Sequence, residues 1–288
     1  MKGGLSQRFV SAPSGVETEV VLCCLIPPSR GIPSPLTSIP TPMRSMLDCM
    51  KPLSERVCLV TGGTRGIGRA IAKMLLMEGA SVAICGQRQE TVDHAVAGLA
   101  ADAAGKVKGK AADVRNHEEV AELFRFVDAE FGRLDVLVNN AGVGIFRHVR
   151  ELSLDEWKHT LETNLYGAFY CSREALFRFG TNGGGYIVNI SSMAGANAFA
   201  GGAAYNASKF GLTGFTEAMM QDVRNENVKV SYIMPGSVAT EFSGRASTDG
   251  ANWKIWPEDV ADIVRLLLQM PERTLVSRVE VRPTRPKS

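Results

Sequence analysis

Short apolar segments alternate with amphipathic segments along most of the chain. The first, RVCLVTGG (56–63), is a continuous run of apolar residues that ends in two glycines. Runs of this kind predict strands that are buried on both faces of a parallel sheet. Strands are expected at 56–63, 81–85, 106–114, 134–142, 185–192, 228–236 and 277–283.

The segments between these runs have helical spacing. In 117–131, Val120, Phe124, Val127 and Phe131 fall on one side of a helix. Helices are also expected from the first glycine turn to about Glu78, and at 90–103, 154–179, 203–226 and 257–270. Alternating strands and helices predict parallel strands joined by right-handed crossovers. The expected fold class is therefore α/β, a single doubly wound Rossmann domain over 51–288, with a seven-stranded parallel sheet and helices on both faces.

Residues 1–50 differ in composition from the rest. Their segment IPPSRGIPSPLTSIPTP is rich in proline, which removes backbone donors and disfavours helix. A disordered, proline-rich extension is expected. The apolar run VVLCCLI is short and follows acidic residues, so a secretory signal is not indicated. Met43, Met46 and Met50 precede the first strand, and we hypothesise that translation begins at one of them.

The composition narrows the possible partners and the compartment. The chain has 32 basic and 30 acidic residues without a basic stripe, so neither a nucleic acid nor a membrane partner is expected. The 6 cysteines match no zinc pattern, and reduced thiols in a cytoplasmic protein are expected. The 4 histidines form no ligand cluster, so no metal is expected and they are interpreted as surface residues.

A glycine turn, TGGTRGIG (61–68), follows the first strand and opens the first helix. Glycines allow a ligand to approach the backbone closely, and a helix amino terminus attracts a pyrophosphate. A purely structural turn is the alternative interpretation. The residues expected to contact a nucleotide here are Gly62, Thr64, Arg65, Gly66, Ile67 and Gly68.

The end of the second strand bears on the choice of nucleotide. An acidic residue there would bind a ribose 2′-hydroxyl and favour NAD(H), but CGQRQ (85–89) contains none. Arg88, together with Arg65 of the glycine turn, suits a 2′-phosphate instead. NADP(H) is therefore favoured over NAD(H). Alternatively, Arg88 is only a solvated residue at a helix start.

Tyr205 and Lys209 in AYNASKF (204–210) are four residues apart and share one face of a helix. A phenol titrates near pH ~10, and a nearby ammonium lowers its pKa towards the range useful for acid–base catalysis. Ser192 ends the fifth predicted strand. Its hydroxyl can hydrogen-bond a substrate carbonyl or alcohol oxygen.

TGGTRGIG, NNAG, NISS and YNASK occur in this order, and together they resemble the short-chain dehydrogenase/reductase family over about 51–288. The resemblance implies an enzyme that interconverts a carbonyl and a secondary alcohol by hydride transfer with NAD(P). Tyr205 would be its acid–base residue, and Lys209 would lower the tyrosine pKa and bind the nicotinamide ribose. Ser192 would orient the reacting oxygen, with Ser191 ranked second, and Asn164 would support a proton-relay water.

The resemblance also implies the remaining cofactor contacts. Asp113 and Val114 would contact adenine. Asn140, followed by Ala141 and Gly142, would lie beside the adenosine ribose. The nicotinamide carboxamide would be held by Pro235, Gly236, Val238 and Thr240.

Substrate choice in the family depends on the segment that corresponds to 241–256. Its aromatic residues could line an apolar pocket or pack onto the protein body, and other residues could border the cleft. These candidates are Phe242, Trp253 and Trp256, then Phe146, Met193 and Phe199.

Three functions stay open, and the first is favoured. The tail SRVEVRPTRP lacks the DGG-like signature of many 3-oxoacyl-carrier-protein reductases, which favours a reductase of small or medium carbonyl compounds. A 3-oxoacyl thioester reductase is the second reading. A non-catalytic nucleotide-binding regulator is the third reading, and it is disfavoured because the expected catalytic residues Asn164, Ser192, Tyr205 and Lys209 are all present.

Relatives in the family pair the helices that match 154–179 and 203–226, so a homodimer or homotetramer is expected.

Overall fold

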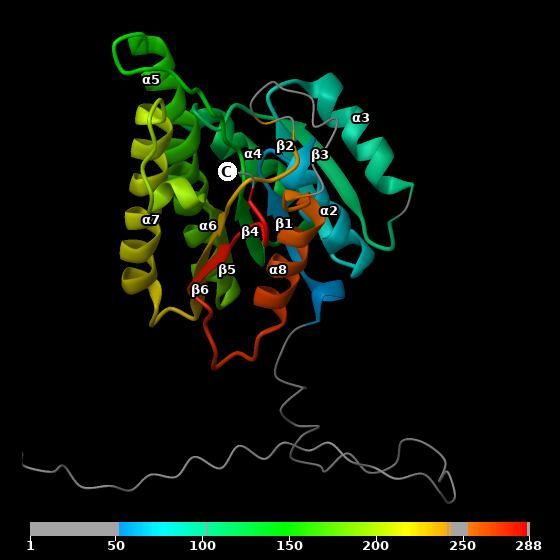
Figure 1. The fold of residues 1–288 in the computed structure, drawn as a ribbon. Helices are drawn as coiled ribbons and strands as arrows, with labels where there is room; N and C mark the ends of the chain where they lie inside the picture. Colours follow the sequence, from blue (N-terminus) through cyan, green and yellow to red (C-terminus); the bar gives the residue numbers. More distant parts are fainter. Residues whose placement is uncertain (1–51, 102, 241, 243–252, 287–288) are drawn as a thin grey trace, which may run out of the picture. The chain divides into compact units, whose positions relative to one another are not determined.

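The computed structural model describes residues 52–101, 103–240, 242 and 253–286. The expectations for residues 1–50, and for most of 241–252, lie outside the described residues. Within these ranges, seven parallel strands form one sheet in the order β3-β2-β1-β4-β5-β6-β7, which confirms the predicted fold class (Figure 1). The strands are β1 (Val57–Val60), β2 (Ser81–Gly86), β3 (Val107–Ala111), β4 (Val136–Asn139), β5 (Gly185–Ile190), β6 (Val228–Pro235) and β7 (Arg278–Val281).

The helices of the described residues connect these strands. The α-helices are α2 (Gly66–Met77), α3 (Gln89–Ala100), α4 (His117–Phe131), α5 (Leu154–Leu161), α6 (Gly167–Asn182), α7 (Ala203–Val223) and α8 (Pro257–Gln269). Three short turns complete the set: η1 (Leu53–Glu55), η2 (Glu162–Tyr166) and η3 (Met193–Gly195).

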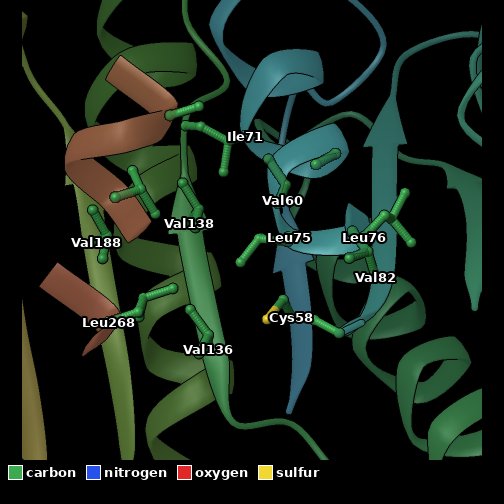
Figure 2. Close-up of a cluster of buried hydrophobic side chains, with 14 of the residues drawn as sticks. Cys58, Val60, Ile71, Leu75, Leu76, Val82, Val136, Val138, Val188 and Leu268 are labelled. Carbon is green, nitrogen blue, oxygen red and sulfur yellow. The ribbon is translucent and has the colours of Figure 1, made fainter. Parts of the chain in front are cut away.

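Each face of the sheet is covered by its own set of helices. Successive side chains of a strand point to opposite faces. In β1, Cys58 and Val60 therefore pack with α2, α3 and α8, whereas Val57 and Leu59 pack with α4, α6 and α7. Figure 2 shows the first cluster, in which Leu75 of α2 and Leu268 of α8 lie over the strands. Burial on both faces explains why the strands read as uninterrupted apolar runs.

Local sequence signals fix several helix ends. Asn116 precedes α4, and its side-chain oxygen accepts hydrogen bonds from the backbone N–H groups of Glu118 (2.9 Å) and Glu119 (3.3 Å). Gly132 ends α4 at φ +76°, a left-handed conformation that glycine adopts without strain. Ser153 and Glu156 form a reciprocal capping box at the start of α5.

The single helix predicted at 154–179 is interrupted. Residues 162–166 form a turn of π-helix between α5 and α6, in which the Gly167 N–H bonds the carbonyl of Glu162. A Cβ on Gly167 would lie 2.7 Å from Val114 Cγ2, so a larger residue could not pack there. Single π turns often mark functional sites, and this one contains Asn164.

The strand order reverses between β1 and β4. Ligands of doubly wound sheets bind at such a switch point, outside the carboxyl ends of the strands. The glycine turn follows β1, NNAG follows β4 and Ser192 follows β5, so the predicted motifs meet at this edge. Among the described helices, none has the length and apolar character needed to cross a membrane.

Candidate active site

Tyr205 and Lys209 lie in the first two turns of α7 and are both buried. Lys209 Nζ is 5.9 Å from the centroid of the Tyr205 ring. The same Nζ donates a hydrogen bond of 2.9 Å to the backbone carbonyl of Ile190, the last residue of β5. The amine is thereby held at the sheet edge, beside the phenol, as the four-residue spacing predicts.

Two adjacent serines follow β5 and face different partners. Ser192 is half-buried and accepts a 3.1 Å hydrogen bond from the Ala194 N–H, and its side chain lies close enough to Tyr205 to lower the pKa of the phenol. Ser191 is buried, and its hydroxyl lies 3.2 Å from Thr213 Oγ1 of α7. The geometry therefore favours Ser192 as the serine that reaches the reacting oxygen.

Burial dominates the electrostatics of the pair. Burial raises the pKa of the Tyr205 phenol above its usual value, and the neighbouring Ser192 side chain opposes that rise. Burial also lowers the pKa of Lys209 to about 8. The expected lowering of the tyrosine pKa by Lys209 is therefore not found in the structure, because removing the phenolate from water outweighs other effects.

Hydrogen bonds of its side-chain amide hold Asn164 in position. Its Nδ2 donates to the Val143 carbonyl and to Ser208 Oγ, both at 2.9 Å, and its Oδ1 accepts from the Val143 N–H at 2.8 Å. The side chain thus ties the π turn to α7 and to the loop after β4. Its role near a relay water stays a prediction.

The glycine turn is held by the NNAG segment. Asn140 Nδ2 donates to the carbonyls of Thr61 (2.9 Å) and Gly62 (3.1 Å). A Cβ on Gly68 would collide with that amide and with the Gly62 carbonyl. The Asn140 side chain is therefore engaged by the turn itself, and its position beside the adenosine ribose stays a prediction.

The turn also lies against the end of β2. The Gly63 N–H bonds the Cys85 carbonyl at 3.1 Å, and a Cβ on Gly86 would lie 2.8 Å from Thr64 Cγ2.

Arg65 and Arg88, at the starts of α2 and α3, are exposed where the glycine turn meets the end of β2. Gly62 and Gly66 have φ values of +62° and +53°, a left-handed conformation that glycine adopts without strain. These residues fit a dinucleotide with its phosphates on the turn.

Asp113 is paired within the protein. Arg115 Nε donates to both of its carboxylate oxygens, at 3.0 and 2.9 Å, and this partner lowers the pKa of Asp113. Arg115 Nη1 also lies 2.8 Å from His159 Nδ1 of α5. His159 is half-buried, and the other three histidines are exposed.

The segment after β6 returns to the glycine turn. Gly236 N–H bonds the Val281 carbonyl at 2.8 Å, and Thr240 N–H bonds the Val238 carbonyl at 2.9 Å. A Cβ on Gly66 would lie 3.4 Å from Thr240 Cγ2. The residues predicted to hold the nicotinamide carboxamide are therefore next to those predicted to hold the phosphates.

The aromatic candidates for a substrate pocket separate into two groups. Phe146 and Phe242 contact the Tyr205 ring, and Phe199 contacts Phe146. Trp256 is instead the residue before α8, more than half exposed, with its N–H bonded to Asp259 at 2.7 Å. Lys254 Nζ lies over the Trp253 ring, 5.9 Å from the ring centroid.

The described cysteines are Cys58, Cys85 and Cys171, which are buried and form no disulfide. Burial raises the pKa of the Cys85 thiol to about 11, as suits a small core residue. Within the described ranges, His, Cys, Asp and Glu side chains form no group that could hold a metal ion.

A glycine turn at the switch point, with a tyrosine and a lysine at the same edge, is the arrangement expected of a dinucleotide-dependent oxidoreductase. The family model described as short chain dehydrogenase matches residues 56–250, and the chain belongs to this family. It is an oxidoreductase of CH–OH groups that uses NAD(P), rather than a non-catalytic nucleotide-binding protein.

Two curated relatives illustrate the similarity. A 3beta-hydroxysteroid dehydrogenase of Mediterraneibacter gnavus is 39% identical over 196 residues, covering 68% of this chain and 70% of that protein. An uncharacterised oxidoreductase of Staphylococcus aureus is 32% identical over 234 residues, covering 81% of this chain and all (100%) of that protein.

Two solved structures share the fold. A metagenomic short-chain oxidoreductase in complex with NADP superposes with a TM-score of 0.72 at 35% identity, covering 82% of this chain and 100% of that one. An alcohol dehydrogenase from the archaeon Thermococcus sibiricus, complexed with 5-hydroxy-NADP, gives 0.75 at 28% identity, covering 81% and 99%. The chain thus has the fold of proteins that bind nicotinamide dinucleotides.

Proposed function

We propose that this protein is an NADP(H)-dependent oxidoreductase that interconverts a carbonyl and a secondary alcohol, with Tyr205 as its acid–base residue. The observation that carries the proposal is that the Ser192 side chain lies beside the Tyr205 phenol, next to the buried amine of Lys209. Two hydroxyl groups that meet in a cleft can bind one substrate oxygen together.

In the direction of reduction, the Tyr205 hydroxyl donates its proton to the carbonyl oxygen. Ser192 Oγ–H donates a hydrogen bond to the same oxygen and orients it. Lys209 carries a positive charge below its pKa of about 8 and stabilises the phenolate that the proton transfer leaves. When bound, NADP(H) supplies or accepts the hydride. Burial of Tyr205 and Lys209 keeps water from competing for the phenol.

The preference for NADP(H) rests on two arginines. Arg65 and Arg88 are both exposed where the glycine turn meets the end of β2. A guanidinium there can pair with a 2′-phosphate in a planar, two-point geometry. Both structural relatives were crystallised with NADP or a derivative of it, which supports the same preference.

The relative from Mediterraneibacter gnavus is named for a ring-borne secondary alcohol, so a cyclic alcohol or ketone is a first candidate substrate. The tail supports a carbonyl reductase over a 3-oxoacyl thioester reductase, because β7 is followed by RPTRP rather than a DGG-like signature. A direct comparison of acetoacetyl thioesters with simple ketones separates the two.

We also propose a cytoplasmic homodimer or homotetramer. The three described thiols are buried and form no disulfide, which suits a reducing compartment. Large apolar side chains stay exposed on the helices that relatives use for pairing, among them Tyr166, Phe169 and Phe210. Exposed apolar patches of this kind mark protein–protein contacts.

The testing experiment compares Tyr205→Phe with wild type for NADPH oxidation over a panel of ketones. Loss of the transferable proton should reduce kcat by about a hundredfold or more, while NADPH binding measured by fluorescence stays the same. Tyr166→Phe, a change of the same kind at an exposed tyrosine on the π turn, serves as the control. Equal rates for Tyr205→Phe and wild type would remove the proposed mechanism.

A further inference from the structure

Three phenylalanine rings gather beside the buried phenol of Tyr205, and we name Phe146, Phe199 and Phe242 the Phe cluster. Phe146 lies 5.5 Å from the Tyr205 ring at an interplanar angle of 74°, and Phe242 lies 5.8 Å from it at 62°. Phe199 lies 5.8 Å from Phe146. The three rings are 41%, 47% and 40% exposed, whereas Tyr205 is 9% exposed. The cluster therefore offers apolar surface next to the proton donor.

The absence of a side chain at Gly144 leaves the space that two of these rings, Phe146 and Phe242, occupy. A Cβ on Gly144 would lie 2.5 Å from Phe242 Cε1 and 2.9 Å from Phe146 Cζ. Any larger residue would push the two rings apart. Gly144 thus lets a ring from the loop after β4 meet a ring from the segment after β6, although the two are far apart in the sequence.

The loops that carry Phe146 and Phe199 are fastened to each other and to α7. Arg147 N–H bonds the Gly201 carbonyl at 2.8 Å, and the two loops form a short parallel bridge. Asn206, next to Tyr205, accepts from the Phe199 N–H at 3.3 Å and donates to the Ala194 carbonyl at 2.8 Å. Two of the rings are therefore held in a fixed position relative to the phenol, as recognition of a rigid ligand requires.

Two cationic side chains near the cluster, Arg147 and Lys209, are occupied within the described residues. The Arg147 guanidinium bonds Glu156 at 3.2 Å. Lys209 is turned towards the Ile190 carbonyl. Neither of these two cations is presented to a carboxylate or phosphate tail on a substrate, and the exposed surface of the three rings is apolar, so the cluster suits uncharged groups.

We propose that the Phe cluster is the specificity surface of the site, and that it selects ketones and secondary alcohols whose reacting carbon lies in or next to an uncharged apolar ring. This inference rests on the proposed function. A rigid ring can stack on, or stand edge-on to, these rings at little cost in entropy, whereas a flexible chain must be ordered to make the same contacts.

The test uses two matched ketones, a propyl-substituted cyclohexanone and a straight-chain methyl ketone with the same number of carbons. Wild type should reduce the ring ketone with a kcat/KM about tenfold higher. Adding a carboxylate to the ring should lower kcat/KM further. Calorimetric titration of the ring ketone into the protein saturated with oxidised NADP, which has no hydride to give, provides a readout of binding that does not depend on turnover.

Phe146→Ala and Phe199→Ala should each lower kcat/KM for the ring ketone by about tenfold or more, and weaken its binding to a similar degree. Their effect on butanone should be much smaller, because a small ketone covers little of the cluster. Phe177→Ala, an exposed phenylalanine on α6, is the matched control and should change neither value.

The outcomes separate this inference from the proposed function. Reduction of both ketones with equal kcat/KM, or ring selectivity that survives both alanine variants, would overturn the inference and leave the proposed function standing. A protein that binds NADPH but reduces no ketone of the series would contradict the proposed function itself.

Discussion

Lys209 Nζ and the carbonyl oxygen of Ile190 are 2.9 Å apart, and the hydrogen bond between them joins α7 to the end of β5. This bond holds a cation in a place where water has been removed, since Lys209 is buried. The cost of that burial is visible in its pKa, which falls from 10.5 to about 8. A buried amine that is kept despite this cost is typical of a functional site.

The lowered pKa predicts a specific pH dependence of stability. Below pH of about 8, Lys209 is protonated in both the folded and the unfolded chain, so the cost of burying the charge is constant. Between about 8 and 10.5 the unfolded chain still binds the proton and the folded chain has released it, so folding becomes more favourable as pH rises.

Lys209→Met removes this linkage and serves as the comparison. The free energy of unfolding of wild type, relative to that of Lys209→Met, should rise over this pH window by at most about 3 kcal/mol. Urea unfolding of both proteins at several pH values measures it. A difference that stays constant through the window, or that falls, would show that the lysine is not buried as a cation.

Gly68→Ala tests the packing of the glycine turn. The added Cβ would collide with the Asn140 amide and the Gly62 carbonyl, so the turn must open. We expect a loss of about 1–3 kcal/mol in stability and much weaker NADPH binding, measured by thermal unfolding and by fluorescence titration.

Gly180→Ala is the matched control for that change. Gly180 lies within α6, and a Cβ there meets no atom within 4 Å. Alanine has the higher helix propensity, so this variant should gain about 0.5–1 kcal/mol and bind NADPH normally. If both variants lost stability alike, the special role of the Gly68 position would be contradicted.

The sequence predicts the strands well for a physical reason. Each strand is buried on both faces, so the apolar runs and the strands coincide, with β1 at Val57–Val60 inside the predicted 56–63. The glycine turn and the Tyr205–Lys209 pair are also readable, because each depends on neighbours within one turn of the chain.

Other features depend on contacts between distant segments. The π turn at 162–166 has the same apolar spacing as a helix, so nothing local marks it before Gly167. The Arg115–His159 contact joins residues 44 positions apart. The pKa of Tyr205 depends on burial by residues from other loops, which spacing on one helix does not reveal.

The choice of cofactor is tested at Arg65 and Arg88. If each pairs with the 2′-phosphate, Arg65→Ala and Arg88→Ala should raise KM for NADPH by about tenfold and leave KM for NADH nearly unchanged. Arg69→Ala is the control, because the Arg69 guanidinium lies beside Gly98 of α3. A wild-type protein that uses NADH more efficiently than NADPH would refute the assignment before any variant is made.

Assembly is tested on the surface of α6 and α7. The Phe169 ring packs 5.8 Å from the Phe215 ring and is 44% exposed, so it spans the junction of the two helices and faces outwards. A carboxylate there would be buried without a partner in any contact between copies that covers this face. Light scattering should therefore show several chains per particle for wild type and fewer for Phe169→Glu.

Met77→Glu is the control for this variant. It places the same charge at an exposed position at the end of α2 and should keep the wild-type mass. A monomeric wild type would contradict the proposed assembly, and an unchanged mass for Phe169→Glu would place the contact on another face.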